Sequence, residues 1–246
     1  MTKNNHIVLR SLAFNLCFMG WSLLASILCA PLFIMGKGWV ARSGPFWAEG
    51  TLFLARKICR ITFEVRGEQH MTSNAVIYAS KHQSAWDTVI FLKLFHWPAY
   101  VLKKELLKIP FWGWYLWRMK MIAIDRSGKA ASLKQMVKQS KQVLFARRPI
   151  VIFPEGTRKA LGDAPDYQVG ISALYNQLHV PVVPVALNSG AYWGKNAFMK
   201  YPGTIIIEFL PSIEAGLGRE EFMSRLQKSI ETASQKLLDE TKTIKE

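Results

Sequence analysis

The chain has 246 residues, enough for one sizeable core, so we expect one catalytic domain. Half of its residues are hydrophobic and nine are Trp, which is more than a fully water-soluble domain needs and indicates contact with lipid. The 32 basic and 17 acidic residues give a net charge of +15, which favours anionic partners such as nucleic acid or an anionic leaflet. Three unevenly spaced Cys argue against a disulfide framework or a zinc site.

The first predicted element is an apolar helical anchor. Residues 11–36 contain no charged side chain, and this run exceeds the roughly 20 residues that a helix needs to cross a bilayer. Basic residues flank both ends, so the positive-inside rule gives no orientation. We prefer a monotopic hairpin that turns near residues 31–38 and returns through residues 46–54, and a spanning helix is the alternative. The sequence therefore predicts membrane-anchoring helices at residues 1–60.

Seven short β-rich runs follow the anchor, at residues 62–65, 76–79, 99–102, 121–124, 150–153, 182–187 and 204–209. Helical patterns occur between and after them, at residues 84–94, 129–145, 171–178 and 219–242. Such alternation predicts an α/β domain at residues 61–246 with a mostly parallel, helix-covered sheet. Residues 100–121 mix aromatic side chains with cations, which is typical of a lipid interface and equally typical of a core.

Open parallel sheets bind ligands beyond the carboxyl ends of their strands, and polar segments occur at those positions. The segment 81–87 follows the second predicted strand and contains a base and a carboxylate. On one continuous helix His82 and Asp87 would point roughly 140° apart, because successive residues are turned by about 100°. If His82 lies in a loop and Ser84 caps a helix that starts at Ala85, Asp87 is the third helical residue and can turn back to the imidazole.

Such a pair predicts general-base chemistry, because a carboxylate on one ring nitrogen fixes the tautomer and leaves the other nitrogen to accept a proton. Taken alone, however, the segment is more typical of a capping box beside a loop histidine. Ser84 lacks the glycine-flanked elbow of a serine nucleophile, so we interpret it as a cap.

The segment 153–159 follows a later predicted strand and suits a phosphate group. Gly156 lets the backbone approach an anion closely, Thr157 adds a hydroxyl donor, and Arg158 supplies a planar fork that matches phosphate oxygens. Glu155 fits less directly, and we expect it to orient Arg158 or to contact the polar backbone of an acceptor. Without further support, the segment is also an ordinary turn with solvated charges.

A third segment, residues 124–127, follows another predicted strand. Arg126 offers a second guanidinium for an anion. Asp125 and Ser127 suit the turn and the N-cap of the next helix, so we interpret them as structural.

In this order, the segments resemble the lysophosphatidic acid acyltransferases, glycerolipid acyltransferases marked by His, four residues and Asp. His82 and Asp87 match that pair, and further blocks match at residues 124–126, 153–158 and 182–185. The resemblance spans residues 63–210 and makes a purely structural segment 81–87 the minority interpretation.

The resemblance implies a 1-acylglycerol-3-phosphate O-acyltransferase that makes phosphatidic acid from lysophosphatidic acid and an acyl-CoA or acyl carrier protein thioester. It implies no metal, no cofactor and no acyl-enzyme. His82 would be the general base and Asp87 its orienting partner. The implied substrate-binding residues are Arg126, Glu155, Gly156, Thr157 and Arg158. We expect the enzyme in the bacterial inner membrane, with its site facing the cytoplasm and membrane lipids around its anchor.

The chain departs from the family's pattern at three positions, Lys81, Lys120 and Gln168, where relatives often carry Asn, Gly and Lys. These departures bear on recognition of the acceptor headgroup and leave the proton-transfer pair intact. Another lyso-lipid, such as lyso-ornithine lipid or a lysophospholipid, is therefore an alternative acceptor. A non-enzymatic basic membrane protein is the alternative from a different class. We expect no nucleic acid partner, because the basic residues form no recognised nucleic-acid module.

Overall fold

The computed structural model describes residues 3–72, 76–125 and 128–243, and within these ranges seven strands form one sheet. The strands are β1 (Ile61–Arg66), β2 (Ile77–Ser80), β3 (Ala99–Lys103), β4 (Ile122–Ile124), β5 (Ile150–Ile152), β6 (Val182–Leu187) and β7 (Gly203–Phe209). Their order in the sheet is β1-β7-β6-β2-β5-β3-β4. All neighbouring pairs are parallel except β6 and β7, so β1 and β7 run against the other strands.

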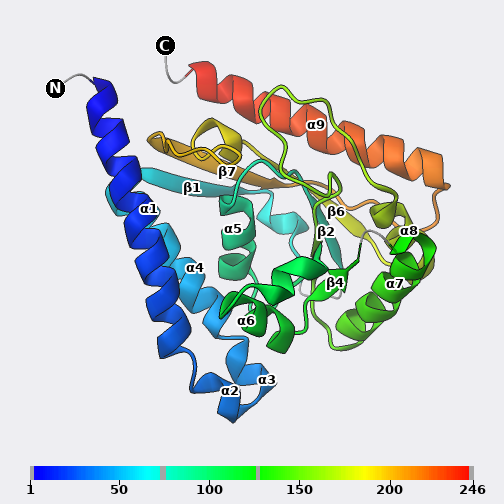
Figure 1. Ribbon diagram of the computed structural model, residues 1–246. Coiled ribbons are helices and arrows are strands. Elements are labelled where there is room, and N and C mark those ends of the chain that lie inside the picture. The colour runs from blue at the N-terminus through cyan, green and yellow to red at the C-terminus, as the bar shows by residue number, and fades with distance from the viewer. Residues whose placement is uncertain (1–2, 73–75, 126–127, 244–246) are drawn as a thin grey trace.

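Helices cover both faces of the sheet (Figure 1). They include α5 (Trp86–Leu94), α7 (Lys129–Phe145), α8 (Val169–Leu178) and α9 (Arg219–Thr243). Alternate residues of the central strands explain the two layers, because successive side chains of a strand point to opposite faces. In β2, Tyr78 belongs to the core cluster shared with α5 and with two N-terminal helices, α1 (Lys3–Leu28) and α4 (Ser43–Leu54). Ile77 and Ala79 belong to the cluster shared with α7, α8 and α9. The predicted helix-covered, mostly parallel α/β sheet is confirmed.

The N-terminal helices form the predicted hairpin. α1 (Lys3–Leu28) is followed by the short α2 (Leu32–Met35) and α3 (Lys37–Val40), and α4 (Ser43–Leu54) returns beside α1 (Figure 1). Two indole hydrogen bonds join the arms: Trp21 Nε1 donates to the Trp47 carbonyl at 2.9 Å, and Trp47 Nε1 donates to Ser22 Oγ at 3.0 Å. A π-helical turn, Ala55–Cys59, leads from α4 to β1.

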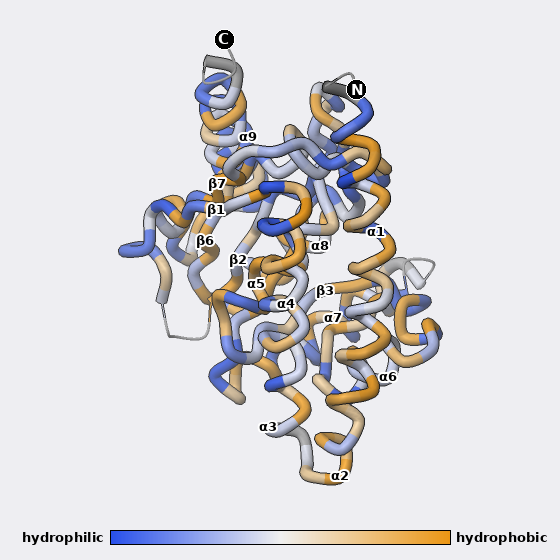
Figure 2. Tube along the Cα trace, turned by 90° about the vertical axis from the view of Figure 1, so that its left-hand side faces the viewer, coloured by the Kyte–Doolittle hydropathy of each residue, from blue (hydrophilic) through white to orange (hydrophobic). Residues whose placement is uncertain are grey.

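One face of α1 exposes apolar side chains, and Figure 2 shows that hydrophobic residues make up much of this helix. Leu16 is 63% exposed and Met19 is 70% exposed. Within the described ranges one segment, Asn5–Leu28, is long and apolar enough to cross a membrane. The opposite face packs on the sheet domain through Phe14, which is fully buried against Trp193. The division of the chain at residue 60 stays a prediction, although contacts such as this one join its two sides.

Residues 100–121 contribute side chains both to the core and to the surface, and their contact with lipid stays a prediction. Tyr100 and Met121 are buried in the core, whereas Trp114 and Trp117 are 56% and 60% exposed. The exposed pair lies on α6 (Trp112–Arg118), a helix that follows the 3₁₀ turn Lys104–Lys108. Tyr115, also on α6, donates to the Ser26 carbonyl of α1 at 2.6 Å, so α6 is docked on the hairpin.

Candidate active site

The candidate site lies where the carboxyl ends of β6, β2 and β5 meet. These strands are parallel neighbours, with β2 between the other two. The loop after β2 carries residues 81–85, the loop after β5 carries residues 153–168, and the turn after β6 carries Ser189. Three segments that are distant in sequence therefore converge at one edge of the sheet, as expected for an open parallel sheet.

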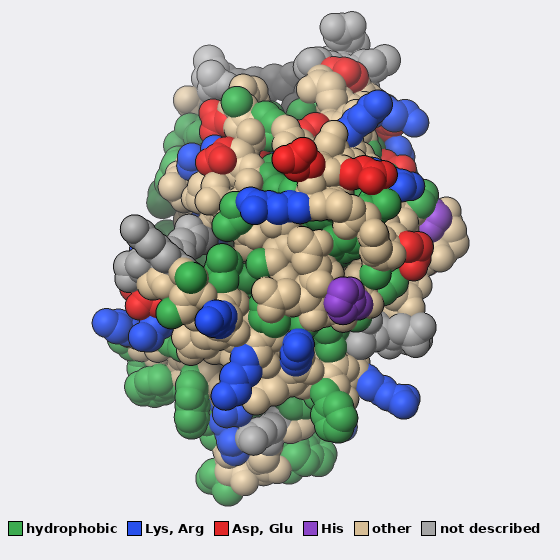
Figure 3. All heavy atoms as spheres, turned by 90° about the vertical axis from the view of Figure 1, so that its right-hand side faces the viewer, with side chains coloured by type: hydrophobic (Ala, Val, Ile, Leu, Met, Phe, Trp, Pro, Cys, Tyr) green, Lys and Arg blue, Asp and Glu red, His purple; other side chains and the backbone are tan. Residues whose placement is uncertain are grey.

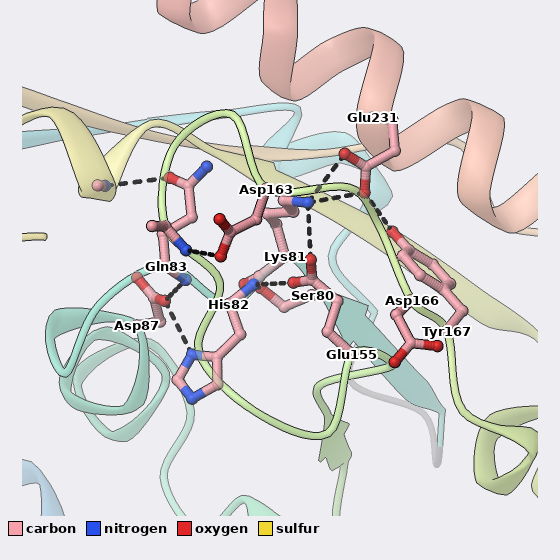
Figure 4. A network of polar contacts seen from close by, with 12 residues as sticks. Ser80, Lys81, His82, Gln83, Asp87, Glu155, Asp163, Asp166, Tyr167 and Glu231 are labelled. Atoms are coloured by element: carbon pink, nitrogen blue, oxygen red, sulfur yellow. Dashed lines mark hydrogen bonds and ion pairs between the residues drawn. The ribbon is translucent and has the colours of Figure 1, made fainter. Parts of the chain in front are cut away.

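His82 and Asp87 form the predicted pair. His82 Nδ1 lies 2.9 Å from Asp87 Oδ2, and the carboxylate is fully buried (Figure 4). The geometry agrees with a loop histidine: α5 begins at Trp86, one residue later than predicted, and His82 lies before it. With Asp87 ionised, Nδ1 carries the proton and donates to the carboxylate, so Nε2 is left with its lone pair.

The same carboxylate also forms the capping box. Asp87 Oδ2 accepts hydrogen bonds from the backbone N–H groups of Gln83 at 2.7 Å and Ser84 at 2.8 Å. In return, Ser84 Oγ accepts from the N–H of Trp86 at 3.0 Å, so Ser84 is a cap as predicted. The two interpretations of this segment are thus not alternatives, because one oxygen closes the helix terminus and faces the imidazole at once.

Two further groups fix the pair. Ser189 donates its hydroxyl to Asp87 Oδ1 at 2.6 Å, so both carboxylate oxygens have donors. The ring of Phe153 stacks on the His82 imidazole, with centroids 3.9 Å apart and an interplanar angle of 17°. Sequence reasoning did not find Ser189, although its position just after a predicted strand was the available signal.

Glu155 has partners other than those expected. Its side chain is fully buried, with Oε1 accepting from Lys81 Nζ at 2.8 Å and Oε2 accepting from the backbone N–H of His82 at 3.0 Å (Figure 4). The expectation that Glu155 orients Arg158 therefore does not hold, because both oxygens are engaged by the loop after β2. Glu155 thus fixes the backbone of His82, the candidate catalytic residue.

The rest of the 153–159 segment forms a turn beside the imidazole. Gly156 has φ of +66°, a left-handed conformation that favours glycine, and its N–H donates to the Phe153 carbonyl at 2.9 Å. Thr157 is exposed and Arg158 is half-buried. Arg158 Nε is a buried atom that has no hydrogen-bond partner within the described part of the chain. Arg126, the other predicted guanidinium ligand, lies outside the described residues.

A cavity of about 1130 Å³ connects these groups to the N-terminal hairpin. Near the hairpin its lining includes Trp47 of α4, Tyr115 of α6 and Cys29, the residue that follows α1. The lining also includes His82, the turn 155–158 and Lys103, a cation that the sequence had suggested only as part of an interfacial region. A cavity lined by apolar side chains and by cations matches an anionic amphiphile.

Desolvation sets the ionisation of one neighbouring group. Burial raises the pKa of Tyr167 well above its ordinary value, and the nearby carboxylate of Glu231 raises it further. The phenol therefore stays protonated at any physiological pH and acts as a donor, with its hydroxyl 2.9 Å from Glu231 Oε1.

The mostly parallel sheet defines an α/β protein, and an imidazole–carboxylate pair lies at the carboxyl ends of its central strands. Residues 62–188 match the family model described as Acyltransferase, and the chain belongs to this family. The matched stretch includes the His82–Asp87 pair and the 153–159 segment, and it ends one residue before Ser189.

Named relatives match a large part of the chain. A 1-acyl-sn-glycerol-3-phosphate acyltransferase of Pseudomonas aeruginosa is 40% identical over 169 residues, which cover 69% of this chain and 66% of that protein. A protein of the same name from Limnanthes alba is 32% identical over 156 residues, which cover 62% of this chain and 55% of that protein. The chain thus spans between about half and two thirds of the length of these two relatives.

The fold has a counterpart among solved structures. The crystal structure of PlsC, the 1-acyl-sn-glycerophosphate (LPA) acyltransferase of Thermotoga maritima, superposes with a TM-score of 0.71. The superposition covers 96% of this chain and 98% of that one, at 18% sequence identity. The likeness at this identity establishes the fold, hairpin included.

Proposed function

We propose that this chain transfers a fatty acyl group from an acyl thioester to the sn-2 hydroxyl of 1-acyl-sn-glycerol 3-phosphate, which gives phosphatidic acid. The observation that carries the proposal is the His82–Asp87 pair, whose imidazole lines a cavity of amphiphile size. The names of the Pseudomonas and Limnanthes relatives support the choice of acceptor.

The reaction needs one proton acceptor near the attacking hydroxyl. As the acceptor oxygen attacks the thioester carbonyl carbon, His82 Nε2 takes its proton, and Asp87 stabilises the imidazolium that forms. The tetrahedral intermediate then collapses, the C–S bond breaks, and the thiolate takes the proton from the imidazolium. The products are the diacyl lipid and a free thiol, and the histidine returns to its starting state. No metal or further cofactor enters this balance.

Arg158 is the group that we assign to the acceptor phosphate. Its Nε is buried and has no hydrogen-bond partner among the described residues, and a guanidinium matches phosphate oxygens with two parallel hydrogen bonds. Thr157 and Lys103 line the same cavity and add a hydroxyl and an ammonium. Gly156 allows the backbone turn, and the buried Glu155 binds Lys81 and the His82 backbone in the loop after β2. Arg126 stays a predicted phosphate ligand.

The surroundings suit substrates delivered from a membrane and from the cytoplasm. The exposed apolar face of α1 fits a monotopic anchor in the bacterial inner membrane, with the site on the cytoplasmic side. Both thioester donors are anionic, and the face shown in Figure 3 carries many Lys and Arg side chains in its lower half. On α7 the exposed lysines Lys134, Lys138 and Lys141 occur without an acidic residue. Acyl-CoA or acyl carrier protein is therefore the donor class.

Co-sedimentation with liposomes checks the anchor. Replacing Leu16 and Met19 by Glu puts two charges on the exposed face of α1 and leaves the buried Phe14 in place. We expect the variant to stay in the supernatant, because a charged side chain is costly in a bilayer. Unchanged sedimentation would place the anchor elsewhere. Leu161→Glu, at a half-exposed leucine in the loop after β5, is the matched control.

An acyl-transfer assay tests the function itself. The purified full chain in mixed micelles receives lysophosphatidic acid, lysophosphatidylcholine or lyso-ornithine lipid, each with acyl-CoA or acyl carrier protein donors, and products are identified by mass. We expect phosphatidic acid to be the main product. His82→Ala should lower the rate by about 10²- to 10⁴-fold, whereas His96→Ala, at an exposed histidine, should not. Acylation of another acceptor in preference, or a fully active His82→Ala protein, would refute the proposal.

A further inference from the structure

A buried network of charged residues extends from the loop after β2, which carries His82 and is called the catalytic loop below, to the C-terminal helix α9. Lys81 is only 5% exposed, and its ammonium lies between two carboxylates. It donates to Glu155 Oε1 at 2.8 Å and to both oxygens of Glu231, at 2.9 and 2.8 Å (Figure 4). Glu155 and Glu231 belong to different elements, the loop after β5 and α9, so one cation joins both to the loop after β2.

The near end of this network holds His82 by its backbone. Glu155 Oε2 accepts the N–H of His82 at 3.0 Å, and the His82 carbonyl accepts the N–H of Lys159 at 2.8 Å. Both polar groups of the His82 peptide are thus bound by the loop after β5. That loop is closed in turn by the Gln168 N–H, which donates to the Pro154 carbonyl at 2.8 Å.

At its other end the network is formed by Glu231, a residue of α9. Glu231 also accepts the Tyr167 hydroxyl at 2.9 Å, so it ties the end of the β5 loop to the helix as well as to Lys81. Because Glu155 is fully buried and Glu231 is 28% exposed at its side chain, Glu231 is the member of the network that water reaches. Removing its charge leaves Lys81 and Glu155 as an isolated pair, without the contacts that fix the ammonium on the α9 side.

We propose that Glu231 is a positioning residue, which holds the His82 loop in its reactive geometry through Lys81 and Glu155. It touches no reacting atom, and its effect passes through the backbone of His82. The inference about catalysis rests on the proposed acyl transfer, whereas the inference about loop geometry does not. Neither the family match nor the predicted motifs include Glu231, which lies beyond residue 188.

The chain offers a closely matched control in Glu240. This residue lies on the same helix, is 32% exposed at its side chain, and pairs with Arg66 Nη1 at 2.8 Å, away from the catalytic loop. Glu231→Gln and Glu240→Gln therefore remove the same charge from two carboxylates of similar exposure, one paired with the buried Lys81 and the other with Arg66, which is 35% exposed. Only the first of the two pairs reaches His82.

The first experiment measures backbone amide hydrogen exchange and turnover in both variants of the full chain. In Glu231→Gln, exchange of the peptide that covers residues 81–84 should become faster, and kcat should fall by about 10- to 100-fold with little change in either KM. In Glu240→Gln, both quantities should match the wild type. The rate loss should persist at temperatures at which both variants are fully folded, which a loss of stability alone would not produce.

A second pair of variants tests the charge balance. Lys81→Gln leaves Glu155 and Glu231 facing each other without a cation, so it should lower kcat more than Glu231→Gln does. Adding Glu231→Gln to Lys81→Gln removes one of the repelling charges and should restore part of the activity, about 10-fold. A double variant no more active than Lys81→Gln would contradict the network.

The outcomes separate the two proposals. If Glu231→Gln and Glu240→Gln show the same exchange and the same kcat, Glu231 is not a positioning residue. If exchange at residues 81–84 responds but the wild type transfers no acyl group, the loop assignment stands and the proposed acyl transfer fails.

Discussion

Two buried carboxylates hold His82, and they hold different parts of it. Asp87 faces the imidazole ring through Nδ1, whereas Glu155 binds the backbone N–H. Both side chains are fully buried. Asp87 receives its other hydrogen bonds from neutral donors, namely two backbone N–H groups and the hydroxyl of Ser189. Glu155 is balanced by the ammonium of Lys81.

This difference assigns the two carboxylates different roles, in proton transfer for Asp87 and in positioning the backbone for Glu155. A carboxylate surrounded by neutral donors keeps its charge available to the imidazolium that forms during proton transfer. A carboxylate paired with a buried lysine is already neutralised, so its main effect is to fix the backbone. We therefore expect amide substitutions at the two positions to affect catalytic rate and stability in opposite proportion.

Asp87→Asn should give the largest effect on rate. An amide lets the ring adopt the other tautomer, with the proton on Nε2, so the base is lost while the packing is kept. We expect kcat to fall by about 10²- to 10⁴-fold. The free energy of unfolding should fall by about 1.5 kcal/mol, because the donors to Asp87 lose a charged acceptor. Steady-state kinetics and urea unfolding measure the two quantities. Asp163→Asn, at an exposed loop residue, is the control. Nearly normal turnover in Asp87→Asn would mean that the pair only caps α5.

Glu155→Gln should reverse these proportions. The amide group keeps one acceptor for two donors, and Lys81 keeps only Glu231 as a charged partner. Breaking a buried pair in this way costs about 3 kcal/mol of unfolding free energy. We expect kcat to fall by about 10-fold, through displacement of the loop. Urea unfolding would contradict the comparison if Asp87→Asn were the less stable of the two proteins.

Arg158→Lys tests the part of the β5 loop that faces the cavity. The lysine keeps the charge but loses the planar fork, so we expect KM for the phosphate-bearing acceptor to rise by about 10-fold and KM for the acyl donor to change little. Arg147→Lys, at an exposed arginine before β5, should leave both constants unchanged. An equal rise in both KM values would show that Arg158 does not distinguish the two substrates.

The sequence predicted what depends on local pattern. The strand at residues 182–187 and the helix at residues 129–145 have the bounds that were predicted, because β-branched runs and the spacing of apolar residues are local signals. Helix geometry showed only that Asp87 can reach a His82 that lies in a loop, and the resemblance to the acyltransferase family made the His82–Asp87 contact the expectation.

Contacts between distant residues could not be predicted in this way. The Ser189–Asp87 and Lys81–Glu231 hydrogen bonds join residues 102 and 150 positions apart, and no local pattern encodes such pairs. The antiparallel β6–β7 pair was missed because strand direction depends on the path of residues 188–202. The short helix α6 was missed because its aromatic side chains suit a core and an interface alike.

Ser189→Ala should give the smallest effect and thereby refine the comparison. The substitution removes one of the donors to Asp87 and leaves the imidazole contact and both N–H bonds in place. A hydrogen bond to a charged group contributes about 1.5 kcal/mol, so we expect kcat to fall by about 10-fold at most, with KM unchanged. Ser172→Ala, at a buried serine whose hydroxyl binds only its own helix, is the control. If Ser189→Ala lowered the rate as much as Asp87→Asn, the hydroxyl would itself contact the reacting groups, and Asp87 would not be the main support of the imidazolium.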